Sequence, residues 1–171
     1  MEQGLIQIFG GTGRGKTSAA VGQGIKAASL GRSVVMIQFL KGSPQGEFDI
    51  IKRLEPEIKL FSFEKSEKCF EELNDDEKKE EIQNIRNGFN FAKKVLQTGE
   101  CDLLILDEFL GLFDNKILGL EDLQELISAK NENTGIIMTG INVSDDICRC
   151  VDEITKLETV RFLKGESYAS F

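Results

Sequence analysis

Short apolar stretches alternate along the chain with longer segments in which apolar residues recur every three or four positions. The short stretches are rich in Val, Ile, Leu and Phe, a composition typical of strands covered on both faces of a sheet. They predict strands at residues 5–9, 33–40, 59–63, 102–106, 134–139 and 154–160. The segments between them predict helices at residues 16–30, 74–98, 120–127 and 144–151, the second of which is opened by a capping box of Asn74 and Glu77 and ended by Gly99.

This regular alternation favours an α/β fold, because parallel neighbouring strands need crossover connections that are usually helices. We predict a mostly parallel sheet of about six strands with helices on both faces. Both prolines, Pro44 and Pro56, fall between predicted elements, and no repeat or low-complexity linker divides the chain. The expectation is therefore a single domain that spans residues 1–171.

Composition narrows the classes of protein that fit. The chain has 171 residues, of which 40% are hydrophobic and 29% are charged, as in a globular protein that buries its own core. The formal net charge of −8 disfavours a nucleic-acid partner, and no stretch approaches the ~18 consecutive apolar residues that a membrane helix needs. The chain has no histidine, which excludes imidazole bases and histidine metal ligands.

The four cysteines fit a reducing compartment. Residues 1–4 lead directly into the first apolar stretch, without the charged and then apolar segment of a secretory signal, so we expect a cytoplasmic protein with reduced thiols. Cys148 and Cys150 lack the Cys-x-x-Cys spacing of zinc sites, and we interpret them as packing residues. Residues 64–81 hold nine acidic residues and four lysines; we interpret this segment as a solvated loop and helix start, with a mobile lid as the alternative.

The strongest chemical signal is the sequence GGTGRGKT at residues 10–17, between a predicted strand and a predicted helix. It matches the phosphate-binding loop G-x-x-x-x-G-K-[ST] in full. Glycines in such a loop let successive backbone N–H groups face an anion, and the helix N-terminus adds positive potential. Lys16 supplies a full charge to the terminal phosphates, and the Thr17 hydroxyl is placed to ligate Mg²⁺. The pattern predicts a P-loop NTPase-like fold that binds a nucleotide through Gly11, Thr12, Gly13, Arg14, Gly15, Lys16, Thr17 and Ser18.

A second signal lies at the end of the strand predicted at residues 102–106. Asp107 and Glu108 follow this strand directly, and the carboxyl edge of a parallel sheet is where ligands bind. Either carboxylate would complete a Mg²⁺ shell with Thr17, directly or through water. We therefore expect Mg²⁺ at Thr17, Asp107 and Glu108, and catalytic roles for Lys16, Thr17 and Glu108.

These residues by themselves leave three reactions open. In an NTPase, water attacks the γ-phosphate and Glu108 orients it; in a kinase, a phosphoryl acceptor takes the place of water. In an adenosyl transfer, the nucleophile attacks the ribose C5′ atom of the nucleotide and triphosphate leaves. That third reaction needs no strong base, because Lys16 and Mg²⁺ stabilise the leaving group.

Further segments carry distinctive sequences: AASLG at residues 27–31, QFLKG at 38–42, LDE at 106–108, IIMTG at 136–140 and VDEITKL at 151–157. With the loop, these segments make the chain resemble the P-loop ATP:corrinoid adenosyltransferases of cobalamin biosynthesis and salvage, in order and over most of its length. Residues 38–42, QFLKG, resemble that family's Q-F-x-K-G strand end, the most distinctive match outside the loop. The other matches are residues 11–20 to G-N-G-K-G-K-T-T-A-A, 27–31 to R-A-x-G-x-G, 106–108 to L-D-E, 136–140 to a strand that ends in T-G-R, and 151–157 to A-D-x-V-T-E-M.

The resemblance implies an enzyme that binds MgATP in the loop and a corrinoid beside it. The Co(I) centre of the corrinoid attacks the ATP C5′ atom and releases triphosphate. Such enzymes are typically homodimers, depend on a reductant for Co(I), and use aromatic residues near the lower face of the corrinoid to remove its axial ligand. Carried over to this chain, the family's site places the triphosphate on Gly11–Thr17, Mg²⁺ on Thr17 and Glu108 with support from Asp107, and the nucleotide and corrinoid cleft on Gln38, Phe39 and Lys41.

The chain departs from the family pattern on the corrinoid side. Ile141 stands where the T-G-R motif has arginine, residues 160–164 lack the histidine of V-K-H-P-F, the closing segment is reduced to residues 165–171, and the chain has no tryptophan. Phe70 is a candidate for one of the family's paired aromatic residues. These departures keep open another class of function, a non-catalytic module that binds ATP or a corrinoid.

Overall fold

The computed structural model describes residues 4–40, 49–63 and 68–165. Its centre is a six-stranded sheet in the order β3-β2-β4-β5-β1-β6, in which every pair of neighbouring strands runs parallel. The strands are β1 (Ile6–Gly10), β2 (Val34–Gln38), β3 (Ile58–Ser62), β4 (Leu103–Asp107), β5 (Gly135–Gly140) and β6 (Glu153–Lys156). The prediction of an α/β fold with a parallel sheet is confirmed.

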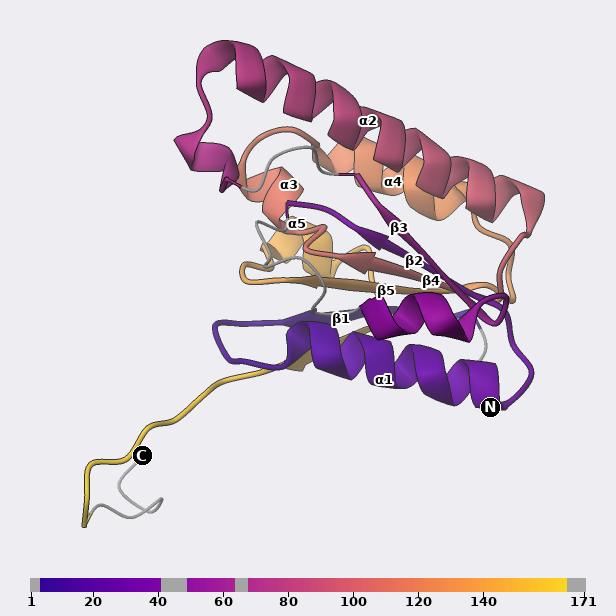
Figure 1. Cartoon of the computed structure of the whole chain (residues 1–171), viewed down its shortest axis with the longest axis horizontal. Helices are drawn as coiled ribbons and strands as arrows, with labels where there is room; N and C mark the ends of the chain where they lie inside the picture. The colour runs from indigo at the N-terminus through magenta and orange to yellow at the C-terminus, as the bar shows by residue number, and fades with distance from the viewer. Residues whose placement is uncertain (1–3, 41–48, 64–67, 166–171) are drawn as a thin grey trace.

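Helices cover both faces of the sheet (Figure 1). Helix α1 (Lys16–Ser29) lies on one face, and α2 (Asp75–Thr98) and α4 (Leu120–Ala129) lie on the other. The shorter elements, which the sequence pattern predicts only in part, are η1 (Asp49–Leu54), η2 (Phe70–Glu72), α3 (Gly111–Asp114) and α5 (Asp145–Cys148). None of the helices in the described residues is long and apolar enough to cross a membrane.

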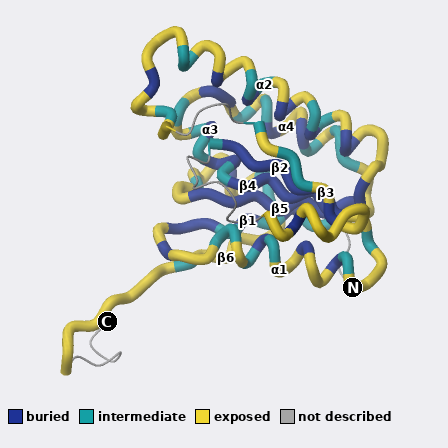
Figure 2. The backbone as a smooth tube through the Cα atoms, viewed as in Figure 1, coloured by how far each residue is buried: buried dark blue, intermediate teal, exposed yellow. Residues whose placement is uncertain are grey.

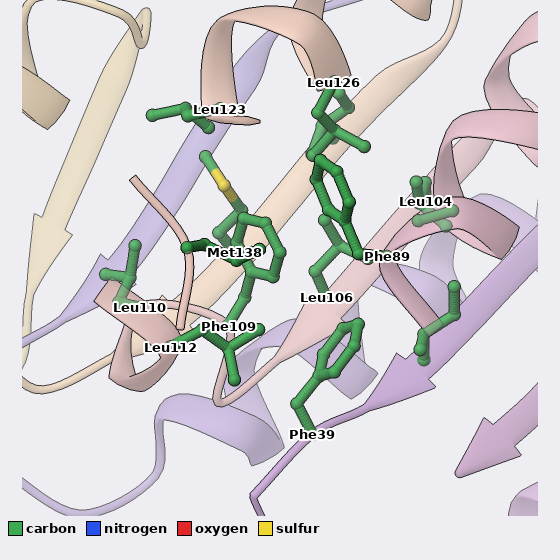
Figure 3. Close-up of a cluster of buried hydrophobic side chains, with 14 of the residues drawn as sticks. Phe39, Phe89, Leu104, Leu106, Phe109, Leu110, Leu112, Leu123, Leu126 and Met138 are labelled. Carbon is green, nitrogen blue, oxygen red and sulfur yellow. The ribbon is translucent and has the colours of Figure 1, made fainter. Parts of the chain in front are cut away.

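Strands β2, β4 and β5 are buried along their whole length because each side of the sheet faces its own core there (Figure 2). Side chains alternate along a strand, so Leu104 and Leu106 of β4 face the larger core with α2 and α4, whereas Leu103 and Ile105 face the smaller core with α1. The larger core contains the phenylalanine and leucine cluster of Figure 3. Each buried strand therefore appears in the sequence as a near-continuous apolar run, because its alternate residues face two different cores.

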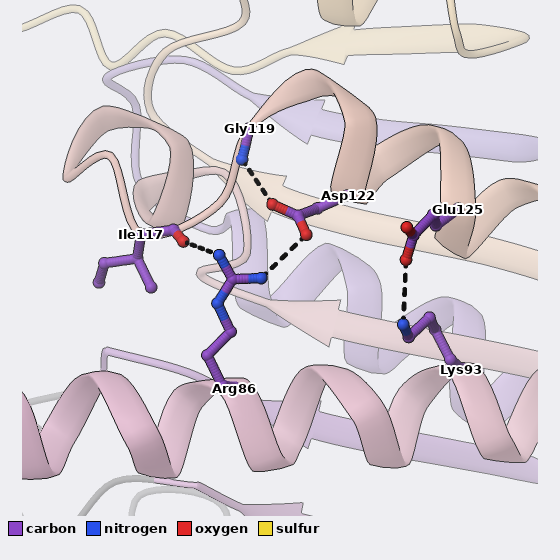
Figure 4. Close-up of polar contacts among 6 residues, drawn as sticks. All are labelled: Arg86, Lys93, Ile117, Gly119, Asp122 and Glu125. Atoms are coloured by element: carbon purple, nitrogen blue, oxygen red, sulfur yellow. Dashed lines mark hydrogen bonds and ion pairs between the residues drawn. The ribbon is translucent and has the colours of Figure 1, made fainter.

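Helix α2 begins and ends where the sequence predicts. The Asn74 side chain accepts a hydrogen bond from the Glu77 backbone N–H (2.9 Å), the Glu77 carboxylate accepts from the Asn74 N–H (2.9 Å), and Gly99 at φ 66° ends the helix. Polar contacts then set α2 against α4 (Figure 4). Arg86 donates to the Ile117 carbonyl (2.8 Å) and to Asp122 (2.9 Å), while Lys93 pairs with Glu125 at 3.1 Å.

Strand β6 and Glu81 differ from the pattern-based expectations. Strand β6 ends at Lys156 rather than at residue 160. In the described part of the chain it pairs with β1 alone, and β1 turns into the glycine-rich loop after Gly10. Glu81, expected in a solvated segment, is buried. Cys101 is buried as well, and burial raises the pKa of its thiol to about 12, so this thiol stays protonated.

Candidate functional site

The candidate site lies at the carboxyl edge of the sheet, where β1, β5 and β4 end side by side. The glycine-rich loop, residues 11–15, connects β1 to α1. The two acidic residues predicted from the sequence stand at the end of β4, which is separated from β1 by β5. The side chains of the site therefore come from three neighbouring strand ends and one helix start.

The loop meets α1 in the geometry that favours an anion. Gly15 caps the helix at φ 96°, a left-handed conformation that glycine adopts without strain. The first intrahelical bond runs from the Ala19 N–H to the Gly15 carbonyl (2.8 Å), so the N–H groups of residues 16–18 have no acceptor within the helix. The Lys16 ammonium donates to the Gly13 carbonyl of the loop (2.8 Å). This half of the loop presents backbone donors and a cation together.

The other half of the loop differs from the expectation that its amides face an anion. The Gly13 N–H donates to the Leu157 carbonyl (2.8 Å), and the Arg14 N–H donates to the Thr159 hydroxyl (2.9 Å). Both acceptors belong to residues 157–159, which follow β6 and which we call the 157–159 segment. After this segment the chain runs away from the sheet (yellow in Figure 1) and is exposed (Figure 2).

Close approach of the 157–159 segment explains two of the loop glycines. A Cβ atom on Gly11 would lie 2.4 Å from the Leu157 carbonyl oxygen, and one on Gly13 would lie 2.6 Å from it. The Gly11 N–H also donates to the carbonyl of Ile141 (3.1 Å), whose side chain is exposed. Both positions need glycine because the backbone of a distant part of this chain lies against them, in addition to any need for space around a ligand.

Asp107 connects the loop to the sheet edge. It is fully buried, and its Oδ1 atom accepts hydrogen bonds from the hydroxyl of Thr17 (2.8 Å) and from the hydroxyl of Thr139 (2.7 Å). The bond to Thr17 brings together two residues that the sequence predicts as one metal site, 90 positions apart. Thr139, at the end of β5, is a site residue that the sequence analysis missed; its signal was a polar residue near the end of an otherwise apolar strand.

Glu108 follows β4 directly and turns away from the strand direction. Its φ of 58° is left-handed, which is uncommon for a residue with a side chain. Its N–H donates to the Thr139 hydroxyl (2.9 Å). The residue is half-buried and stands beside Asp107, as the sequence predicts.

The end of β2 lies next to Asp107, but only part of its predicted role fits. Gln38 is in register with Asp107 and accepts a bond from the Ser62 hydroxyl (3.3 Å). Phe39, expected to line a cleft, is fully buried in the larger core, with its ring 5.6 Å from that of Phe109 (Figure 3). The side chain therefore belongs to the core. Only the backbone of Phe39 reaches the site, where its N–H donates a hydrogen bond to the Asp107 carbonyl (3.0 Å). Lys41 lies outside the described residues.

The remaining predicted residues differ in exposure, and one of them belongs to another part of the fold. Thr12, Arg14 and Ser18 are exposed, and Lys16 and Thr17 are half-buried. Phe70, the aromatic candidate, is half-buried in η2, packs against the larger core and lies 5.9 Å from the Lys78 ammonium.

The donors at this edge fit a magnesium ion that is shared with a phosphate ligand. Oxygen atoms of a hydroxyl and a carboxylate are the ligands that Mg²⁺ prefers, and Mg²⁺ is commonly held by one or two carboxylates together with substrate phosphates. Thr17 and Asp107 supply such atoms within hydrogen-bond distance of each other, and Glu108 is adjacent in sequence. Within the described parts of the chain, no three or more His, Cys, Asp or Glu residues gather to hold a metal alone.

Comparison with known proteins finds similar sequences over most of the chain. A family model described as "ATP:corrinoid adenosyltransferase BtuR/CobO/CobP" matches residues 2–167. The corrinoid adenosyltransferase of Escherichia coli (strain K12) is 29% identical over 161 residues, which cover 94% of this chain and 79% of that protein. The corrinoid adenosyltransferase CobA of Salmonella typhimurium is also 29% identical over 161 residues, with the same shares of the two chains covered.

A solved structure is similar in fold alone. The KaiC-like protein PH0186 from Pyrococcus horikoshii OT3 superposes with a TM-score of 0.58 at 15% sequence identity, over 93% of this chain and 75% of that one. The family assignment therefore depends on the sequence match and on the loop and carboxylates that lie within it. Because the family model spans nearly the whole chain, the chain belongs to the ATP:corrinoid adenosyltransferase family.

Proposed function

We propose that the protein transfers the 5′-deoxyadenosyl group of MgATP to the Co(I) centre of a corrinoid and releases triphosphate. The observation that carries the proposal is the 2.8 Å bond between Thr17 and Asp107, which joins a complete phosphate-loop sequence to a buried carboxylate at the same sheet edge. The family match over residues 2–167 selects adenosyl transfer among the reactions that such a site can support.

The reaction asks little acid–base chemistry of the protein. The cobalt electron pair forms the Co–C5′ bond, the C5′–O bond breaks, and both of its electrons leave with triphosphate, so cobalt passes from Co(I) to Co(III). No proton has to be removed from the nucleophile, which suits a chain without histidine. The protein's part is to hold and orient the triphosphate and to stabilise the charge that develops on it.

The residues at the sheet edge divide this work. Lys16 and the N–H groups at the start of α1 bind the phosphate oxygens as the leaving group gains charge. Thr17, Asp107 and Glu108 hold Mg²⁺, with Thr17 and Asp107 already in contact. When bound, Mg²⁺ neutralises charge on the triphosphate and makes it a better leaving group. Gln38, in register with Asp107, lies at the edge where the nucleotide and corrinoid meet.

The products of the reaction test this proposal. The protein is incubated anaerobically with ATP, Mg²⁺ and chemically reduced cobalamin, and we expect a light-sensitive Co–C product and triphosphate in equal amounts. ADP in place of triphosphate, without a cobalt–carbon product, would instead indicate an ATPase if free phosphate is released or a kinase if an acceptor is phosphorylated. Tight ATP or corrinoid binding with no turnover would indicate a non-catalytic module, and either result contradicts the proposal.

The proposal extends to the setting of the enzyme, as the family resemblance implies. We place the reaction in the cytoplasm, with a separate reductant that supplies Co(I) and with a homodimer as the working form. Analytical ultracentrifugation of the full chain tests the last point, and a purely monomeric protein with full activity contradicts it.

ATP binding is also expected to break hydrogen bonds between the loop and the 157–159 segment. If the phosphates use the Gly13 and Arg14 amides, those N–H groups must release Leu157 and Thr159. Replacing Thr159 with valine removes one competing acceptor, and we expect ATP to bind about fivefold more tightly, which corresponds to one hydrogen bond of ~1 kcal/mol. Isothermal titration calorimetry measures the change.

A matched control for this substitution is Thr155→Val. Thr155 is an exposed threonine of β6, in register with Phe9 rather than with the loop. The control should bind ATP as the unchanged protein does. Weaker binding by Thr159→Val would show that the segment supports the loop during binding instead of competing with the nucleotide.

A further inference from the structure

Thr139 occupies a central position at the sheet edge. It lies on β5, between the strand that leads into the phosphate loop and the strand that ends in Asp107. Its side chain is completely buried, and its hydroxyl makes two contacts: it donates to Asp107 Oδ1 (2.7 Å) and accepts from the Glu108 N–H (2.9 Å). One hydroxyl thus contacts both acidic residues.

The two contacts restrain different groups, namely the carboxylate of Asp107 and the backbone of Glu108. The bond to Asp107 fixes a carboxylate oxygen that also accepts from Thr17, so the plane of the Asp107 carboxylate is defined by two donors from two elements. The bond from the Glu108 N–H holds the backbone of Glu108 in its left-handed conformation, which costs free energy and persists only where neighbours support it.

The chemistry of the contact suits a site for a divalent cation. A hydroxyl donor orients a carboxylate and leaves its negative charge in place, whereas a lysine or arginine in the same position would neutralise the charge that the cation needs. Thr17 and Thr139 each donate such a hydroxyl hydrogen bond to Asp107 Oδ1. Groups that orient metal ligands in this way commonly change metal affinity when they are removed.

We propose that Thr139 is a positioning residue, which sets Asp107 and Glu108 in the orientation that binds the divalent cation of the nucleotide complex. The proposal rests on the proposed function, because it takes the nucleotide site and its cation from there. In this role Thr139 acts through the two acidic residues that its hydroxyl contacts.

The chain offers a matched control at the other end of the same strand. Thr134 immediately precedes β5 and is buried like Thr139. Its hydroxyl lies within hydrogen-bond distance of two acceptors, Asn131 Oδ1 (2.9 Å) and the Cys101 carbonyl (3.3 Å). Valine has nearly the same shape as threonine, so at either position it removes a buried hydroxyl and keeps the shape of the side chain. A loss of stability common to both variants is then a packing effect, and a loss of metal binding confined to Thr139→Val is a positioning effect.

The test measures cation binding without any corrinoid. Mn²⁺ replaces Mg²⁺ as a paramagnetic probe, and electron paramagnetic resonance follows its binding to the full-length protein saturated with a non-hydrolysable ATP analogue. We expect Thr139→Val to raise the Mn²⁺ dissociation constant about tenfold, Thr139→Ser to restore it to within about threefold of the unchanged protein, and Thr134→Val to leave it unchanged. Thermal unfolding of all three variants reports their stability.

Two results would overturn the proposal. One is an unchanged Mn²⁺ dissociation constant in Thr139→Val, and the other is an equal weakening in Thr134→Val. Failure of the proposed function gives a different pattern, because a protein that binds the Mn²⁺–nucleotide complex normally but forms no cobalt–carbon bond contradicts the transfer reaction and leaves the Mn²⁺ comparison intact.

In an active enzyme, Thr139→Val should raise the Mg²⁺ concentration for half-maximal rate, and excess Mg²⁺ should restore most of kcat.

Discussion

Replacing Lys16 with alanine is expected to weaken ATP binding by at least about a hundredfold, or ~2.7 kcal/mol. The ammonium is the cation that the loop places next to the donors of the helix start, and it lies 2.8 Å from the Gly13 carbonyl. Its removal takes away the charge-assisted bond that we propose to the phosphates and a bond that shapes the loop. Isothermal titration calorimetry with ATP and Mg²⁺ measures the loss.

The matched control is Lys26→Ala. Lys26 lies in the last turn of the same helix and is exposed, so its loss removes an equal charge far from the loop. This control should bind ATP normally, and both variants should unfold at temperatures close to that of the unchanged protein. Normal ATP affinity in Lys16→Ala would mean that the loop is not the nucleotide site, and the proposed function would fail with it.

Replacing Asp107 with asparagine is expected to lower the rate of adenosyl transfer by at least about a hundredfold, because it removes the charge that we propose holds the cation. The substitution keeps the shape of the side chain. Since the hydroxyls of Thr17 and Thr139 both donate to Oδ1, the amide oxygen of asparagine can accept both bonds at the same place. The fold should therefore survive, and circular dichroism during thermal unfolding checks this.

Asp102→Asn is the control for this second prediction. Asp102 immediately precedes the same strand, at its opposite end, is exposed, and accepts bonds from the backbone N–H (2.8 Å) and hydroxyl (3.1 Å) of Ser33. Its replacement should leave the rate and its Mg²⁺ dependence unchanged. If Asp107→Asn kept the full rate at low Mg²⁺ concentration, Asp107 would be a structural residue only, and the cation would have to be held by other groups.

The elements of this fold could be predicted because their signals are local. A buried strand shows as an apolar run of about five residues, and the capping box of α2 needs only Asn74 and Glu77 three positions apart. The phosphate loop is equally local, since eight consecutive residues define it. The carboxylates could be placed near it because parallel strands end at one edge.

The role of Phe39 could not be predicted, because it depends on packing between distant segments. An aromatic residue after a strand can face a ligand or the core. Here α2 comes close over it at Gly88, where a Cβ atom would lie 2.9 Å from Phe39 Cε1, and the ring fills the space below the helix. Phe39 faces the core because one helix comes close to the sheet at this point. The pattern of apolar positions in the sequence does not show that approach.

By itself, the amino-acid sequence determined the type of each main element, the phosphate loop and the identity of the acidic residues, because these depend on neighbours a few positions apart. Tertiary structure alone decided the strand order, and with it the insertion of β5 between β1 and β4 that brings Thr139 onto Asp107 and Glu108. It also decided that the amides of Gly13 and Arg14 meet residues 157–159, across 145 positions for Arg14 and Thr159. Hydrogen bonds over such separations arise from the order in which strands pair, and no local spacing of residues encodes that order.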